Sequence, residues 1–234
     1  GDVYKRQDMS RIRQAARRSE DPWSSTVVLG VFPTLGPYLL PRIMPALRRL
    51  KPKLTIRFIE EKSAKLIDLL DSGQVDAAIL SESLNAPSIK VCHVFDEDFL
   101  LATSTNSLLG HESKPIELSD LSTQKVLLLE DGHCMRRSML DVCQKVGAKQ
   151  SEFRATSLET LRYMVVGSKD VTLLPRLATV PPIVQPVGLM LREFKNPKPY
   201  RSLYLNWRAA SPVDKIMEGL CTIISSACSD LHKK

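Results

Sequence analysis

This sequence lacks the long apolar runs that cross a membrane, because no stretch approaches the ~18–20 uninterrupted apolar residues that span a bilayer. Its amino terminus has no apolar segment of the signal-peptide type, and we therefore expect a cytoplasmic protein without membrane contact. It also lacks a glycine-rich phosphate loop, a Gly-x-Ser-x-Gly elbow and a His-Glu-x-x-His motif. The common nucleotide-binding and hydrolase functions therefore have no supporting motif.

Cysteine is scarce, with five residues in a chain of 234. Five scattered cysteines are too few for a secreted disulfide scaffold, and an odd number cannot all pair internally. We therefore expect each to be a thiol in a reducing cytosol. The net charge of +7 supports a nucleic-acid partner only weakly, since the first 20 residues alone carry +3 of it.

Short β-rich runs alternate with helical patterns from residue 26 onward, which predicts an α/β fold with parallel strands and crossover helices. Glycine, proline and capping residues delimit the segments. The expected strands are residues 26–32, 54–60, 76–80, 90–103, 126–129, 153–155, 171–174 and 201–208. The expected helices are residues 37–50, 63–70 (capped by Ser63), 133–146, 158–166 and 213–231. Residues 175–186, with four prolines, are expected to form a loop.

Composition suggests two lobes after an unusual start. Residues 1–25 are basic with almost no apolar periodicity, which suggests the remnant of a longer linker helix, or a sequence artefact in the first seven residues. We expect subdomain I over residues 26–95 plus 203–234. Subdomain II is expected over residues 96–202. The two long strand patterns would carry the chain between the lobes.

Cys134 is the candidate reactive thiol. It follows Gly132 and His133 at the start of a predicted helix, where the helix amino terminus, a protonated His133 and the neighbouring Arg136 and Arg137 would all lower its pKa. The alternative is a small buried apolar residue, the commonest role of a free cysteine. The sequence alone leaves both roles open.

Cys143 lies nine residues later, on the apolar side of the same predicted helix. In an intact helix the two thiols would lie on opposite faces, about 13.5 Å apart along the axis. A disulfide requires Cα atoms within about 7 Å, so forming one would require the helix to unfold. Such a pair could act as a redox switch, although two unrelated cysteines would have the same spacing.

The other cysteines and the histidines suggest no metal site. Cys92 lies in a strand pattern, and Cys221 and Cys228 lie on or beside the apolar stripe of the last helix, so all three are expected to be core thiols. The Cys-His neighbours lack the spacing of zinc ligands. We therefore expect neither a metal nor a cofactor.

Four further groups could hold a small polar ligand, because open α/β sheets bind ligands beyond the carboxyl ends of their strands. Thr34 and Ser63 occupy such positions in the first lobe, and His133 does so in the second. Arg208 ends the last strand and could supply a fixed positive charge. The alternatives are simple helix caps and a solvated surface arginine.

Several segments together resemble the regulatory domain of LysR-type transcription factors, and most closely the hydrogen-peroxide sensors of that family. Two patterns are shared widely within the family, and Gly132-His133-Cys134 with a second cysteine nine residues on marks the peroxide sensors. The matching segments are residues 33–41, 70–76, 129–134, 153–161 and 172–175. Ser63 stands where the family commonly has threonine.

The resemblance implies two Rossmann-like subdomains joined by crossover strands, similar to type II periplasmic binding proteins. It implies that Cys134 reacts with hydrogen peroxide, that Cys143 resolves the sulfenic acid, and that Thr34, Ser63, His133 and Arg208 line the peroxide site. It also implies a homodimer, a tetramer of the full-length protein, contact with promoter DNA and RNA polymerase through that protein, and a reductant such as glutaredoxin. The family's DNA-binding domain is expected to be absent here.

Two other functions remain as alternatives. One is a LysR-type domain that binds a small organic effector between its lobes, with incidental cysteines. The other is a thiol peroxidase. We expect stoichiometric sensing and not an enzyme, because each oxidation would require outside reduction.

Overall fold

The computed structural model describes residues 21–110 and 114–232, and it confirms the predicted α/β class. The suggested linker-helix remnant and artefact within residues 1–20 lie outside the described residues. The chain divides into two compact units. The first contains the described residues up to Phe32, Leu40–Val94 and Tyr204–Cys228; the second contains Pro33–Leu39, Phe95–Leu203 and the residues from Ser229.

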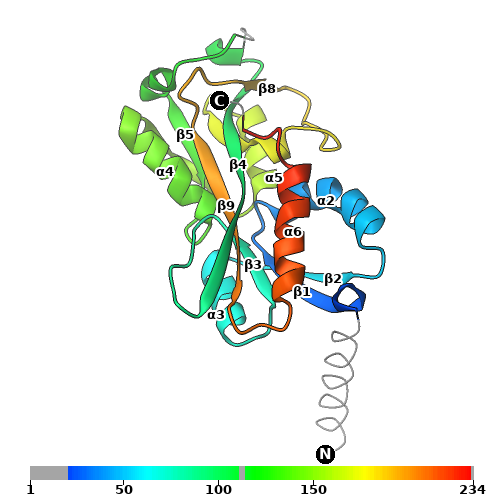
Figure 1. Cartoon of the computed structure of the whole chain (residues 1–234). Helices are drawn as coiled ribbons and strands as arrows, with labels where there is room; N and C mark the ends of the chain where they lie inside the picture. Colours follow the sequence, from blue (N-terminus) through cyan, green and yellow to red (C-terminus); the bar gives the residue numbers. More distant parts are fainter. Residues whose placement is uncertain (1–20, 111–113, 233–234) are drawn as a thin grey trace, which may run out of the picture. The chain divides into compact units, whose positions relative to one another are not determined.

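The first unit is built on a sheet whose strand β1 lies between β2 and β3, with both pairs parallel (Figure 1). β3 is buried throughout, and its other edge pairs antiparallel with β9. The apolar run Ala77–Leu80 fits this interior position, because a strand covered on both faces needs no polar alternation. The elements are β1 (Thr26–Val31), β2 (Thr55–Glu60), β3 (Ala77–Leu80), β9 (Tyr200–Arg208), α2 (Gly36–Leu50), α3 (Ser63–Asp71), α6 (Asp214–Ala227) and the short η1 (Pro22–Ser24).

The second unit has two sets of strands. β4 pairs antiparallel with both β7 and β8, and β5 pairs parallel with β6. The chain runs from β5 into α4 and from β6 into α5, and α4 lies alongside β5 in Figure 1. The elements are β4 (Ile89–Ser104), β5 (Lys125–Leu129), β6 (Lys149–Ala155), β7 (Thr172–Pro175), β8 (Leu189–Arg192), α4 (Cys134–Val146), α5 (Leu158–Val166), and the short helices η2 (Leu108–Gly110), η3 (Leu118–Thr123) and η4 (Arg176–Ala178).

Among the described residues, two strands and one helix have residues in both units. β4 begins in the first unit and continues in the second, β9 returns from the second to the first, and α2 begins with residues of the second unit. Pro33–Leu39 thus belongs to the second unit, whereas the sequence analysis placed it in the first lobe. The alternation of strands and helices in the sequence cannot show this assignment, because it does not indicate which of the two units a turn packs against.

The sequence missed β8 and misplaced one cap. Leu189–Arg192 forms a short strand in a region without a predicted element, since its proline-rich surroundings hide a strand that pairs with distant β4. α3 begins at Ser63, but its N-cap is Lys62, and no side-chain hydrogen bond caps the helix. The predicted cap at Ser63 is therefore wrong.

Candidate functional site

Helix α4 carries both cysteines of the predicted redox pair. It follows β5 and a turn at Gly132, whose φ of +91° favours glycine, and Gly147 at φ +70° forms its C-cap. One face of α4 packs into the core through Met135, Met139 and Val142. Burying such side chains stabilises a helix by about 1.5–3 kcal/mol each. The predicted helix at residues 133–146 is thus confirmed within one residue.

Cys134 is the first residue of α4, and its thiol is free and partly exposed. His133 is the N-cap residue, but its imidazole makes no capping hydrogen bond to the helix. The backbone N–H groups of the first helical turn therefore lie beside a thiol that solvent can reach. The partly exposed thiol is therefore accessible to a small oxidant.

Cys143 lies on the buried face of α4, with 2% of its surface exposed. Its thiol is free, and burial raises its pKa above the ordinary value, an effect that a backbone hydrogen bond only partly opposes. The two thiols differ in access, and nine helical residues separate them by about 13.5 Å along the axis. The intact helix therefore keeps the two thiols too far apart to form a disulfide.

Arg136 braces the turn before α4. Its Nε donates to Asp131 Oδ1 at 2.8 Å, and its Nη1 donates to the Leu129 carbonyl at 2.8 Å. Arg154 Nη1 also lies 3.7 Å from Asp131 Oδ2. The sequence assigned the charge of Arg136 to Cys134, but the Asp131 carboxylate neutralises much of it.

Thr34 is buried in the second unit, where Arg201 holds it. Arg201 Nη1 donates to Thr34 Oγ1 at 3.3 Å, and Nη2 donates to the Thr34 carbonyl at 3.1 Å. The same guanidinium pairs with Glu97 Oε2 at 2.7 Å, and both side chains are almost fully buried. Glu97 also accepts a hydrogen bond from the Leu177 N–H at 2.7 Å. A buried pair with its hydrogen bonds satisfied fixes the position of the Thr34 hydroxyl.

Sequence reasoning missed Glu97 and Arg201 as groups around a predicted site residue. The available signal was the acidic Asp96-Glu97-Asp98 segment inside a β-rich run, since a buried carboxylate requires a cation. Asp98 is also fully buried and lies 3.3 Å from Arg176 and 2.5 Å from His232 Nδ1. Glu97 and Asp98 thus connect several segments of the second unit through buried ion pairs and hydrogen bonds.

Ser63 and Arg208 lie in the first unit. The Ser63 hydroxyl oxygen is buried and has no hydrogen-bond partner within the described residues. Arg208 Nη1 donates to the Leu70 carbonyl and, at 2.9 Å, to the Val75 carbonyl. Arg208 thereby satisfies carbonyls at and after the end of α3, a structural role that the sequence did not indicate. Thr34, His133, Cys134 and Cys143 all belong to the second unit, whereas Ser63 and Arg208 belong to the first.

Cys92 and Cys221 correct the prediction of three core thiols, because they form a disulfide with Cα atoms 6.6 Å apart. Cys92 is also partly exposed, while Cys221 is 3% exposed. Only Cys228 remains the expected buried thiol. Strand and helix periodicity place a residue on a face but cannot show which distant thiol meets it.

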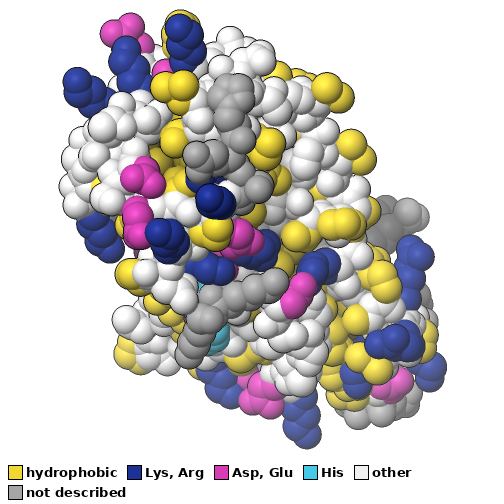
Figure 2. Space-filling view, turned by 90° about the horizontal axis from the view of Figure 1, so that it is seen from above, with side chains coloured by type: hydrophobic (Ala, Val, Ile, Leu, Met, Phe, Trp, Pro, Cys, Tyr) yellow, Lys and Arg dark blue, Asp and Glu magenta, His cyan; other side chains and the backbone are white. Residues whose placement is uncertain are grey.

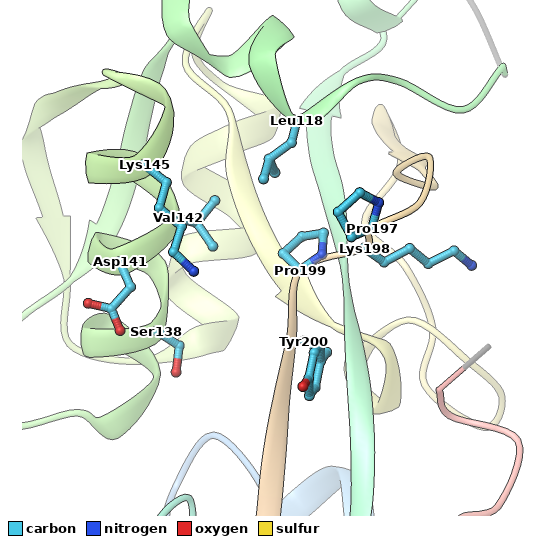
Figure 3. Close-up of a pocket in the computed structure, with 9 residues that line it drawn as sticks. All are labelled: Leu118, Ser138, Asp141, Val142, Lys145, Pro197, Lys198, Pro199 and Tyr200. Atoms are coloured by element: carbon cyan, nitrogen blue, oxygen red, sulfur yellow. The ribbon is translucent and has the colours of Figure 1, made fainter. Parts of the chain in front are cut away.

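A cavity of about 360 Å³ borders α4 in the second unit. In Figure 3, residues of α4 lie on one side, and the segment Pro197–Tyr200 and Leu118 lie on the other. The lining residues of the helix are Ser138, Asp141, Val142 and Lys145. This side of α4 thus has open space beside it.

The described residues hold no group of three or more His, Cys, Asp or Glu side chains that could bind a metal ion. Within the same residues, no helix is both long and apolar enough to cross a membrane.

The family model for the LysR substrate binding domain matches residues 20–229. The chain is 36% identical over 214 residues to the DNA-binding transcriptional dual regulator OxyR of Escherichia coli K12, covering 91% of this chain and 70% of that protein. The reduced form of OxyR is 36% identical, with a TM-score of 0.80 over 90% of this chain and 99% of the other. The oxidised form of OxyR is 37% identical, with a TM-score of 0.77 over 89% and 98%.

Proposed function

We propose that this chain, which belongs to the LysR substrate-binding-domain family, is the regulatory domain of a hydrogen-peroxide-sensing transcription factor with Cys134 and Cys143 as its redox pair. One observation carries the proposal: two free thiols, one accessible and one buried, lie nine residues apart on the single helix α4. The likeness to OxyR supports the same function, and it argues against a small organic effector.

The chemistry starts at the accessible thiol. The Cys134 thiolate attacks one oxygen of hydrogen peroxide, the O–O bond breaks, and the leaving hydroxide takes up a proton to become water. Cys134 is then a sulfenic acid. The Cys143 sulfur attacks the Cys134 sulfur, which forms the disulfide and releases a second water molecule. Two thiols are oxidised by two electrons, and one peroxide is reduced to two waters.

The second step requires α4 to unfold at least in part, because the helix holds the thiols about 13.5 Å apart. Cys143 must also leave the core, which removes the packing of its neighbours Met139 and Val142. The covalent bond therefore replaces helix hydrogen bonds and buried apolar contacts. Peroxide chemistry at one sulfur is thereby converted into a change of backbone structure.

Donors near the peroxide are assigned by resemblance. We propose that Thr34 and His133 orient the peroxide and stabilise the leaving hydroxide. The Arg201–Glu97 pair supports the first of these, because it fixes the Thr34 hydroxyl. We expect Thr34→Val to slow formation of the sulfenic acid without preventing folding.

The proposal extends to partners and location. The full-length cytoplasmic protein would form homodimers and tetramers, bind promoter DNA, recruit RNA polymerase and be reset by a thiol reductant such as glutaredoxin. On the face shown in Figure 2, Lys and Arg side chains are interspersed with Asp and Glu. The chain would act stoichiometrically and not as an enzyme.

The deciding experiment is a peptide map after treatment with micromolar hydrogen peroxide. We expect a Cys134–Cys143 peptide and the loss of two alkylatable thiols. Cys134→Ser should abolish this bond, whereas Cys228→Ser, the matched change at a buried thiol outside α4, should leave it intact. A thiol count unchanged by peroxide would overturn the proposal, and sustained turnover with a reductant would favour a thiol peroxidase.

A further inference from the structure

The disulfide in the first unit lies on a defined seam between a strand and a helix. Cys92 lies near the start of β4, and Cys221 lies on α6. Lys90, two residues before Cys92, pairs with Asp214 at 2.7 Å, and Asp214 lies seven residues before Cys221. Because strand residues two apart and helix residues seven apart share a face, the ion pair and the disulfide join the same faces of β4 and α6.

The two sulfur atoms differ in access. Cys92 is partly exposed, whereas Cys221 is 3% exposed and lies among the buried apolar residues Leu220 and Ile224. Which sulfur an incoming thiolate attacks depends on access. A small thiol can therefore approach the disulfide at Cys92, and Cys221 is the sulfur that leaves.

We propose that Cys92 and Cys221 form a second thiol–disulfide exchange site, which reacts at Cys92 with low-molecular-weight thiols and disulfides. Its Cα separation of 6.6 Å already suits a disulfide, so bond formation needs no refolding of either element. The peroxide-responsive pair on α4 has the opposite property. The chain thus carries two dithiol sites, one in each unit, and the new site does not depend on the proposed function of the other.

The exchange is balanced in both directions. In reduction, a thiolate attacks the Cys92 sulfur, the Cys92–Cys221 bond breaks, and the Cys221 thiolate takes up a proton; a second thiolate then attacks the mixed disulfide and frees Cys92. In oxidation, the Cys92 thiolate attacks a small disulfide and releases one thiol. Cys221 then attacks the Cys92 sulfur and releases the second thiol. Each direction transfers two electrons between the pair and the small molecule.

The exchange also changes what holds the two elements together. With the bond intact, the start of β4 and the middle of α6 are joined covalently across 129 residues of sequence. After reduction, the disulfide no longer joins the two elements, and the partly exposed Lys90–Asp214 ion pair still connects them. Exposed ion pairs of this kind contribute little stability. Reduction should therefore loosen α6 against β4.

The test uses Cys134→Ser/Cys143→Ser protein, in which the α4 pair cannot react. The protein is equilibrated with mixtures of reduced and oxidised glutathione, quenched with acid, alkylated in denaturant so that buried thiols also react, and mapped by mass spectrometry. We expect three alkylatable thiols under reducing conditions, namely Cys92, Cys221 and Cys228, and the loss of two of them with a Cys92–Cys221 peptide under oxidising conditions. Cys228→Ser added to this background should leave the same bond in place.

Two single replacements test the direction of attack. With Cys221→Ser, glutathione should accumulate as a mixed disulfide on Cys92. With Cys92→Ser, the buried Cys221 should remain unmodified while the protein is folded, as monitored by circular dichroism. Absence of the Cys92–Cys221 peptide at every glutathione ratio, or equal modification of the two cysteines, would overturn the proposal. Neither result bears on the peroxide response, which is measured at Cys134 and Cys143.

Discussion

The two cysteine pairs differ in whether the folded backbone already brings their Cα atoms close enough for a disulfide. Cys134 and Cys143 are close in sequence and share one helix, yet that helix keeps them about 13.5 Å apart. Cys92 and Cys221 are 129 residues apart in sequence, yet the folded first unit brings their Cα atoms to 6.6 Å. Bond formation therefore disrupts the fold at one pair and reinforces it at the other.

This difference assigns each pair a different kind of response. Oxidation of the α4 pair must overcome helix hydrogen bonds and the burial of Met135, Met139 and Val142, so it is coupled to a structural change. Oxidation of the β4–α6 pair is coupled to no refolding. The α4 pair therefore suits signalling, whereas the β4–α6 pair suits a change in the stability of the folded first unit.

The largest expected effect tests the reinforcing pair. In Cys134→Ser/Cys143→Ser protein, reduction of Cys92–Cys221 should lower the free energy of unfolding by about 4 kcal/mol, because the bond closes a long loop in the unfolded chain. The measurement is urea denaturation of the oxidised and reduced forms. Adding Cys92→Ser should remove the difference. An unchanged unfolding midpoint after reduction would show that the two pairs do not differ in this way.

The next effect tests the disrupting pair. Met139→Ala should cost about 3 kcal/mol, because the side chain is fully buried on the core face of α4. The same change should speed formation of the Cys134–Cys143 disulfide after peroxide treatment, since the helix that must unfold is weaker. Stopped-flow mixing followed by alkylation measures this rate. Gln144→Ala, an exposed change on the same helix, should alter stability by no more than about 0.5 kcal/mol.

A smaller effect is expected at the end of α4. Gly147 has φ +70°, so Gly147→Ala should strain the C-cap by about 1 kcal/mol, although no atom lies within 4 Å of the added Cβ. The change should again speed disulfide formation. Gly167→Ala is the matched control, because this C-cap of α5 has φ −86°. If both replacements change the rate of Cys134–Cys143 disulfide formation equally, strain at the C-cap of α4 is not the cause.

The smallest effect is a pH dependence of stability. Burial raises the pKa of Cys143 in the folded state, whereas the unfolded thiol titrates near its ordinary value of about 8.5. The unfolded state therefore loses this proton first as pH rises, so the contribution to stability is complete below about pH 8 and declines above it. We expect the melting temperature to fall more between neutral and alkaline pH in the parent protein than in Cys143→Ala.

A matched replacement separates this contribution from other groups that titrate at alkaline pH. Cys134→Ala should retain the full decline in melting temperature, because the titration concerns the buried thiol. If Cys134→Ala and Cys143→Ala flatten the profile equally, burial of Cys143 is not the cause.

Local features were predictable from the sequence. The strand before Cys134, the turn at Gly132 and the helix over residues 133–146 all follow from nearby residues, and the structure confirms them. The position of Cys143 on the buried face follows from helical periodicity. The roles of Cys134, Cys143, Thr34, Ser63, His133 and Arg208 in peroxide chemistry stay predictions.

Long-range contacts were not predictable. Thr34 and Arg201 are 167 residues apart, and Glu97 and Arg201 are 104 residues apart. Two further contacts also join residues that are far apart in sequence. Arg208 donates hydrogen bonds to the carbonyls of Leu70 and Val75, and Cys92 forms a disulfide with Cys221. No periodicity or cap in one segment encodes which residue of another segment will face it.

The sequence by itself determined the α/β alternation, helix α4 and the spacing of its two thiols, because strand and helix periods and glycine turns act over a few residues. Only the tertiary structure decided that Cys92 meets Cys221, that Arg201 and Glu97 hold Thr34, and that Arg136 turns to Asp131. The physical reason is burial: once a charge or thiol leaves water, its partner is whichever group the packed core brings within reach.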